Sequence, residues 1–374
     1  MKIPGSICVI CKGTKHLCGA QACPILARIR TQLRAEFKKE EQLTAGNFLV
    51  TENLALGPIS GPYSLPSLFG KEYSEVVSAL SSSLFAKSFS MRSELEEIAL
   101  SSKPIDISVE FTRKPEPRPK FSPFISPIGA SAPIKTIELE SNPSIPPIVD
   151  EVMEDRLLAK EAIFEIERKE KDIYYLSRVL SSGLLGKSPR LVPTRNSITA
   201  VDSILSKRNI EKIKEFPQAS SYSIAFSSFL HNTFTIILLP TPWQFENFEA
   251  YIPGSLWVPS STSPVITEEY EPYQGRGTYA DKQAGGYYAV RFAVTEYLLK
   301  EGRQAGVVVI REVGEAYKVP VGVWQVRENA RNALKKVLSF LTLSEALEEA
   351  KKRLSLPINE YIKRSRVLYQ KRLF

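Results

Sequence analysis

A cluster of cysteines near the amino terminus has the spacing of a metal site. The cysteines of the 374-residue chain are Cys8, Cys11, Cys18 and Cys23, in the pattern C-x2-C-x6-C-x4-C. Four thiolates suit zinc, which binds them tetrahedrally in closed structural sites. Gly13 and Gly19 permit the tight turns that such a site needs. We therefore expect a structural Zn2+ ion here, with an iron–sulfur cluster or two disulfides as the alternatives.

Carboxylates form a second set of candidates, because a nuclease that uses Mg2+ or Mn2+ needs several of them around its metal ions. The candidate catalytic residues are Asp202, Glu246, Glu249 and Glu312. No D-x-D, E-x-K or H-x-D motif brings them together in the sequence. A metal-dependent nuclease or a nucleotide-handling enzyme therefore stands as the alternative to a binding protein.

Basic, hydroxyl and amide side chains in three loop or helix-entry segments could bind phosphate or nucleic acid. They are Arg195, Ser197, Thr199, Gln274, Arg276, Lys282, Arg327 and Arg331. In residues 191–202 a hydroxyl could cap a helix that starts near Asp202, and a helix amino end attracts anions. The alternative there is simple capping beside a surface arginine.

The other two loop or helix-entry segments have different signals. Residues 270–288 are rich in glycine and tyrosine, which suits contacts to bases and backbone. Arg327 and Arg331 lie four residues apart and share a helix face. Phosphate binding and salt bridges with Glu312 and Glu328 are equally open for this pair.

An aromatic stretch at residues 240–257 has two interpretations. It could provide stacking platforms for bases, or it could be part of the core, and we favour the core. Residues 183–188 (GLLGKS) lack the four-residue spacing of a Walker A loop, so NTP hydrolysis is not expected.

Composition and charge limit the class of protein. Hydrophobic residues make up 43% and charged residues 24%, as in globular proteins. A formal net charge of +8 favours a polyanionic partner. The sequence shows no apolar run of about 20 residues and no apolar leader at its start, so we expect a cytoplasmic protein without a membrane partner.

The pattern of apolar residues predicts an α+β fold, with a mixed α/β arrangement as the alternative. Helices are expected at residues 24–41, 72–86, 91–100, 150–172, 202–216, 281–300, 324–340 and 344–371. Strands are expected at residues 107–112, 220–229, 233–239, 306–312 and 315–321. The proline-rich residues 104–147 should lie draped over a surface.

These elements suggest four parts. Residues 1–45 would form the small zinc module and its helix, and residues 46–147 a region that includes the draped segment. Residues 148–355 would be the larger mixed-sheet core flanked by helices. Residues 356–374 would be a helical tail.

Several motifs together resemble the archaeal Nre family of DNA repair proteins, of the NreA type. They are the cysteine module, Gly57–Pro62, Leu191–Asp202, Trp243–Trp257, Glu271–Gly275 and Gly322–Glu328. The resemblance covers nearly the whole chain. It implies DNA as a partner, a nucleoid-associated role and action through the PCNA sliding clamp, but no assured catalytic mechanism.

In that family a carboxy-terminal peptide is thought to bind the clamp. Here the chain ends in Gln370-Lys371-Arg372-Leu373-Phe374. Gln370, Leu373 and Phe374 match the spacing of a clamp-binding peptide, although the usual final aromatic residue is absent. The alternative is a basic helix end without a partner.

Overall fold

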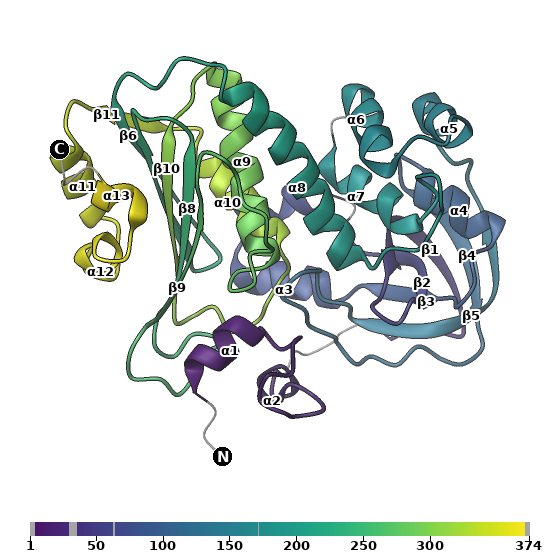
Figure 1. The fold of residues 1–374 in the computed structure, drawn as a ribbon. Helices are drawn as coiled ribbons and strands as arrows, with labels where there is room; N and C mark the ends of the chain where they lie inside the picture. The colour runs from purple at the N-terminus through teal and green to yellow at the C-terminus, as the bar shows by residue number, and fades with distance from the viewer. Residues whose placement is uncertain (1–3, 30–35, 63, 171, 371–374) are drawn as a thin grey trace. The chain divides into compact units, whose positions relative to one another are not determined.

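The computed structural model describes residues 4–29, 36–62, 64–170 and 172–370. The chain divides into two compact units, which are drawn in Figure 1. We call residues 30–204 the barrel unit, and residues 1–29 with residues 205–374 the sheet unit. The expected division near residue 148 thus falls inside the barrel unit, and the cysteine segment is grouped with the carboxy-terminal residues.

A closed barrel forms the centre of the barrel unit. Its strands in the described residues are β1 (Glu40–Val50), β2 (Leu56–Ser60), β3 (Leu84–Lys87), β4 (Ile105–Phe111) and β5 (Ala130–Leu139). The order around the barrel is β1-β2-β3-β5-β4, and β1 also pairs with β4. β3 and β5 run parallel, and the other neighbours are antiparallel.

The barrel interior follows from strand periodicity. Ile105, Ile107, Val109 and Phe111 alternate with more exposed residues along β4, so one face of the strand is buried. Leu95 of α4 (Ser93–Leu100) packs into the same core. The expected draped segment at residues 104–147 therefore contains two barrel strands.

The remaining helices of the barrel unit differ from expectation at their ends, and the helix Ile173–Ser182 was not expected. They are α3 (Tyr73–Ser81), α5 (Pro147–Glu154), α6 (Ala159–Lys169) and α7 (Ile173–Ser182), with a short 3-10 helix at Leu65–Leu68. The single helix expected at residues 150–172 is two helices, because the chain turns at Arg156, whose φ is +49°. The helix expected at residues 72–86 ends at Ser81, and β3 follows.

The centre of the sheet unit is a mixed sheet. Its strands in the described residues are β6 (Tyr222–Phe229), β7 (Asn232–Leu239), β8 (Gln244–Tyr251), β9 (Val265–Glu271), β10 (Gly306–Val313) and β11 (Val337–Phe340). They are ordered β11-β6-β7-β10-β8-β9. β8 and β10 are parallel, and the other neighbours are antiparallel.

Helices cover both faces of this sheet (Figure 1). One face carries α11 (Leu343–Lys351), α12 (Asn359–Ile362) and α13 (Arg366–Gln370), whose apolar residues join the sheet in one core cluster. On the other side lie α9 (Gly285–Glu301) and α10 (Trp324–Ala333). α8 (Thr194–Ile213) runs from the barrel unit into the sheet unit.

Three expectations for the sheet unit and its cysteine segment were wrong. Of the helix expected at residues 24–41, the described residues show α2 (Pro24–Ala27) and a strand β1 that already begins at Glu40, and residues 30–35 lie outside the described residues. Residues 315–321 form no strand, and residues 337–340 are β11 rather than the end of a helix. The aromatic residues 244–251, expected in the core, form strand β8 between β10 and β9. In the described residues, no helix has both the length and the apolar character needed to cross a bilayer.

Candidate functional site

The four cysteines line one cavity in the sheet unit. Cys8 and Cys11 belong to α1 (Gly5–Cys11), and Cys23 directly precedes α2. The cavity has a volume of about 560 Å3, and residues 257–261 also line it. All four cysteines are free thiols. Among the described residues no three His, Cys, Asp or Glu side chains are arranged as a metal site, so zinc binding stays a prediction.

The backbone around Cys11 favours its thiolate. Burial raises the pKa of this thiol, but backbone N–H groups of residues 13 and 15–17 outweigh burial, and the pKa is lowered. The pKa of Cys8 is raised by burial and by the three other cysteines, so the Cys8 sulfur lies close enough to the other three for their charges to act on it. Gly13 has φ +74°, and a Cβ there would lie 2.7 Å from Leu26 Cδ1, so the turn requires glycine.

Lys12 connects the cysteine segment to the sheet. It is the residue after Cys11, with φ +47°, and its Nζ lies 2.8 Å from Glu249 Oε2. Nζ also donates to the Gln283 carbonyl oxygen at 3.1 Å. The side chains of Lys12 and Glu249 are both buried, at 8% and 0% exposed. Sequence analysis missed this residue, because an isolated lysine between two ligand-type cysteines gives no signal of its distant partner.

Glu249 is the centre of a buried charge network. Arg311 Nη1 lies 2.8 Å from Glu249 Oε1, and the Tyr251 hydroxyl donates to Oε2 at 2.8 Å. Arg311 also donates twice to Asn232 Oδ1, at 3.0 and 2.7 Å. Burial raises the pKa of Glu249, but Lys12 and Arg311 outweigh burial and lower it. This carboxylate is therefore held ionised by protein cations.

Glu246 and Glu312 point to the other face of the sheet and support the carboxy-terminal segment. Glu312 accepts hydrogen bonds from the backbone N–H of Ser355 at 2.6 Å and of Leu356 at 3.0 Å, and from the Tyr361 hydroxyl at 2.7 Å. Glu246 accepts from the Ser365 hydroxyl and from the next backbone N–H. Burial raises the pKa of Glu246.

The candidate carboxylates do not form one metal site. Glu246 and Glu249 are three residues apart on β8, so a strand places them on opposite faces. Glu312 shares the Glu246 face, where both accept hydrogen bonds from protein groups. Asp202 is buried within α8. No observation on these residues favours the nuclease alternative.

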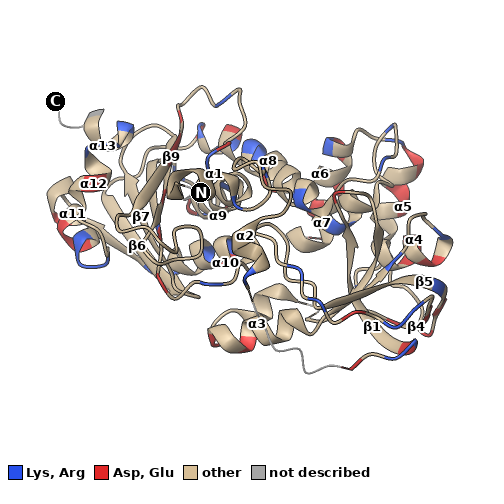
Figure 2. Ribbon diagram, turned by 90° about the horizontal axis from the view of Figure 1, so that it is seen from below, with Lys and Arg blue, Asp and Glu red and all other residues tan. Residues whose placement is uncertain are grey.

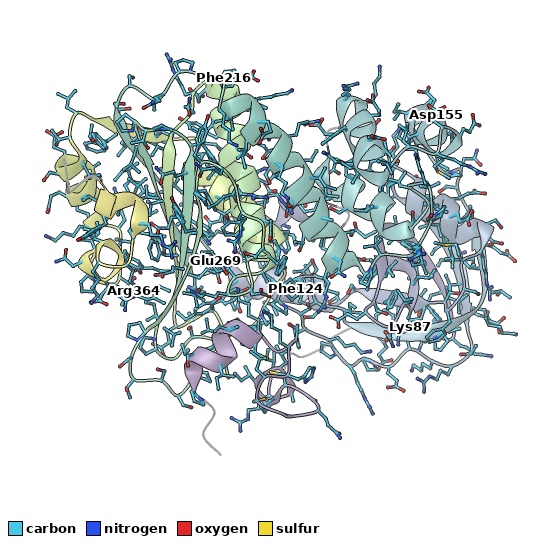
Figure 3. The ribbon with its side chains drawn as sticks, viewed as in Figure 1. Lys87, Phe124, Asp155, Phe216, Glu269 and Arg364 are labelled. Carbon is cyan, nitrogen blue, oxygen red and sulfur yellow. The ribbon has the colours of Figure 1, made fainter. Side chains whose placement is uncertain are left out.

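The loop between β9 and α9 is held by its own ion pair. Arg276 Nη2 lies 2.9 Å from Glu269 Oε2, and its guanidinium carbon lies 4.9 Å from the centre of the Tyr287 ring. The side chain is 11% exposed, so Arg276 holds the loop more than it faces solvent. Figure 3 labels Glu269 in this region. Gln274 and Lys282 are exposed.

The two arginines of α10 differ. Arg331 forms ion pairs with Glu296 and Glu328, both at 2.8 Å, so of the two open interpretations the salt bridge describes this residue. Arg327 is buried, at 1% exposed. Neither presents a free guanidinium to solvent.

The expected helix-entry site at residues 191–202 changes, because α8 begins at Thr194 and not near Asp202. Ser197 and Thr199 are therefore inside the helix, and their hydroxyls donate to the carbonyls of Thr194 and Arg195. They do not cap its amino end. Arg195 remains partly exposed and pairs with Glu52 at 2.6 Å.

The aromatic stretch and the tail have different outcomes. Trp243, Phe245, Phe248 and Trp257 are at most 3% exposed, which confirms the core interpretation.

In the tail, α13 ends at Gln370, whereas Leu373 and Phe374 lie outside the described residues.

Comparison with known proteins defines the class of this protein. The family model described as Archaeal Nre, N-terminal, matches residues 67–258, and that described as Archaeal Nre, C-terminal, matches residues 271–373. The chain therefore belongs to the archaeal Nre family.

Two of three individual relatives extend over more than nine tenths of the chain. DNA repair protein NreB of Archaeoglobus fulgidus is 34% identical over 96% of both chains. DNA repair protein NreA of the same organism is 31% identical over 92% of this chain and 93% of its own. DNA repair protein NreA of Haloferax volcanii is 36% identical over 63% of this chain and 58% of its own. The expected NreA type is thus not distinguished from NreB, and no solved structure matches.

Proposed function

We propose that this chain is a DNA repair protein that binds DNA and acts without cleaving it. The observation that carries the proposal is the similarity over 96% of both chains to a protein named for DNA repair. The formal net charge of +8 supports a polyanionic partner. The separate protein contacts of Glu246, Glu249 and Glu312 support a binding role over a nuclease.

Binding and cleavage can be measured with the same substrates. The purified full-length protein is incubated with labelled single-stranded, duplex and branched DNA, with and without Mg2+ or Mn2+. We expect binding that weakens as salt rises, because phosphate contacts release counterions. Cleavage that requires the metal and is abolished in Glu249→Gln or Asp202→Ala would overturn the proposal of a binding protein.

A structural zinc ion belongs to this proposal. Cys8, Cys11, Cys18 and Cys23 would hold it, because all four line one cavity and N–H groups surround the Cys11 thiol. Bound there, a zinc ion would supply structural cross-linking, since four thiolates leave no open position for a substrate. Lys12 then ties this module to the sheet through Glu249.

Association with the PCNA sliding clamp is the last part of the proposal. Gln370, Leu373 and Phe374 have the spacing of a clamp-binding peptide, whose apolar side chains a hydrophobic pocket of the clamp would accept. The protein would then work at the nucleoid in the cytoplasm, positioned on DNA by the clamp.

A further inference from the structure

The strand pairing of the barrel unit defines a known type of barrel. β1 pairs with β4 through Glu40–Ala45 and with β2 through Ala45–Val50, with a shift in register at Gly46. β3 runs parallel to β5, and α4 lies between β3 and β4 in the chain. Five-stranded barrels with this order, pairing and helix position are OB folds, which bind oligonucleotides or oligosaccharides.

We infer that the barrel unit is an OB fold that binds single-stranded DNA along its β4–β5 loop, residues 112–129. This inference rests on the proposed DNA binding and specifies where it occurs and which form of DNA is bound. Four observations carry it: the strand order, the charge of the loop, its anchoring and an exposed aromatic side chain just after β3.

The β4–β5 loop concentrates positive charge. Its cations are Arg113, Lys114, Arg118 and Lys120, and its one carboxylate is Glu116, so its formal charge is four minus one, or +3. Glu116 lies 3.2 Å from Arg113 and 3.7 Å from Arg118, and so is shared between them. The Arg118 side chain is 83% exposed. Such charge favours a polyanion over a neutral oligosaccharide.

Cations from the barrel extend this surface. Burial lowers the pKa of Lys87 at the end of β3, and the charges of Lys120 and Arg113 lower it further. Lys87 is thus close enough to Lys120 and Arg113 to be repelled by both, and phosphates would relieve that repulsion. Lys39, just before β1, and Lys135, on β5, share a single carboxylate, Glu110. Blue segments mark cations around β4 and β5 in Figure 2.

The loop is anchored on the outside of the barrel. Ile125 and Ile128 pack against Leu49 and Phe85, which point away from the barrel interior. The loop therefore packs against the outer side of β1 and β3 at these residues, and it is itself one of the two loops that bind ligands in OB folds. Bound DNA would consequently run along the loop and the adjoining end of β3 rather than across the strands.

Arg195 links the two loops that border the ligand in OB folds. It pairs with Glu52 in the β1–β2 turn, and its guanidinium carbon lies 5.7 Å from the centre of the Phe124 ring in the β4–β5 loop. Figure 3 labels Phe124 and Lys87. Arg195, a candidate phosphate-binding residue in the sequence, therefore positions the β4–β5 loop.

An exposed aromatic side chain supplies a stacking surface. Phe89 follows Lys87 by two residues and is 72% exposed. Contact between an apolar phenylalanine ring and water is unfavourable, and covering the ring would relieve it. Bases stack on aromatic rings with little dependence on sequence. Two residues from Lys87, it suits a base of a single strand whose phosphates contact Arg113 and Lys120.

The test compares two triple variants of the full-length protein that carry the same charge. Arg113→Ala/Lys114→Ala/Lys120→Ala changes the β4–β5 loop, whereas Lys160→Ala/Arg168→Ala/Lys169→Ala changes exposed cations of α6. The probe is a fluorescent oligothymidylate of about 15 nucleotides, within the range for one OB fold. Affinity is measured by anisotropy at several salt concentrations, with an equal-length duplex in parallel.

We expect the loop variant to bind the single strand at least tenfold more weakly than the α6 variant. The slope of its log Kd against log salt concentration should also be smaller by about 2, because each phosphate that the loop no longer neutralises contributes about 0.7 to that slope. Phe89→Ala should weaken binding by about tenfold without changing this slope, because stacking releases no counterions. Circular dichroism checks that the exposed substitutions leave the fold intact.

The outcomes separate the two proposals. A wild-type protein that binds no DNA would overturn the proposed function. Wild-type binding that falls equally in the loop and α6 variants would overturn the barrel inference and leave DNA binding intact. Equal or tighter binding of the duplex by the wild type would overturn the assignment to single strands.

Discussion

Lys12 Nζ lies 2.8 Å from Glu249 Oε2, a buried ion pair between residues 237 positions apart in the sequence. Lys12 sits inside the cysteine segment, and Glu249 sits on a central strand of the sheet. The pair fixes the small amino-terminal segment on the larger core. A cysteine segment held in this way is part of the sheet unit and not an independent finger.

Removing the Lys12 charge should destabilise the protein. We expect Lys12→Met to lower the free energy of unfolding by about 3 kcal/mol, at the low end for a broken buried pair because Arg311 still faces Glu249. Lys15→Met is the matched control, since the Lys15–Asp281 pair is 3.6 Å long and its Asp281 side chain is 77% exposed, and should cost less than about 1 kcal/mol. Urea unfolding measures both, and equal decreases would contradict the role of Lys12.

The pKa of Glu249 predicts how its contribution varies with pH. Because its pKa in the folded state is lowered, its stabilisation is present above the unfolded pKa of about 4.3 and is lost as the pH falls through the folded value. Glu249→Gln should therefore be much less stable than wild type at pH 7, and the difference should narrow in acid. Unfolding free energies between pH 3 and pH 7 test this. A difference that does not change with pH would show that the pKa of Glu249 is the same in the folded and unfolded protein.

Glu312 should hold the carboxy-terminal segment on the sheet. Glu312→Gln weakens the hydrogen bonds that this side chain accepts from two backbone N–H groups and the Tyr361 hydroxyl. We expect it to lower the free energy of unfolding by about 1–3 kcal/mol. Hydrogen exchange should quicken at residues 355–361. Glu348→Gln, on the exposed side of α11, is the control and should leave exchange unchanged. Unaltered exchange in Glu312→Gln would mean that apolar packing alone holds the segment.

Zinc content tests the proposed metal site. We expect about one zinc ion per chain by elemental analysis, and loss of that zinc in Cys18→Ser, because a structural site needs all four ligands. His16→Ala is the matched control in the same turn and should retain the metal. A folded wild-type protein that contains no zinc would remove this part of the proposal.

The tail can be tested by pull-down with the sliding clamp. Leu373→Ala/Phe374→Ala should reduce recovery of the clamp, because apolar side chains fill the hydrophobic pocket that such peptides use. Lys371→Ala/Arg372→Ala is the control and should retain binding if the contact is not simply electrostatic. Undiminished recovery with the first variant would make the tail an ordinary chain end.

Local patterns in the sequence predict many of the elements. Strands β4, β6, β7 and β10 and helices α4 and α9 lie close to where they are expected, because their apolar residues follow periods of 2 or 3.6. The ends of elements are less predictable. The sequence pattern predicts helix for β11, since its four residues follow α10 closely and are too few to show a period of their own.

The candidate site is predictable only where its parts are neighbours in the sequence. The cysteines lie within 16 residues, so their spacing alone indicates that they meet. The candidate carboxylates are chosen only because they are Asp or Glu. The residue type does not predict which face of a sheet a side chain occupies. Once residues 244–251 are known to be a strand, the three-residue spacing of Glu246 and Glu249 separates them.

The sequence by itself determined the family, the α+β class, the cysteine cluster and the positive charge, since each is a property of composition or short spacing. Tertiary structure alone decided the partner of Lys12, the barrel order β1-β2-β3-β5-β4 and the place of the basic β4–β5 loop beside Lys87. The reason is physical: strand pairing and buried ion pairs join residues tens to hundreds of positions apart. Their energies depend on burial and geometry that no local pattern records.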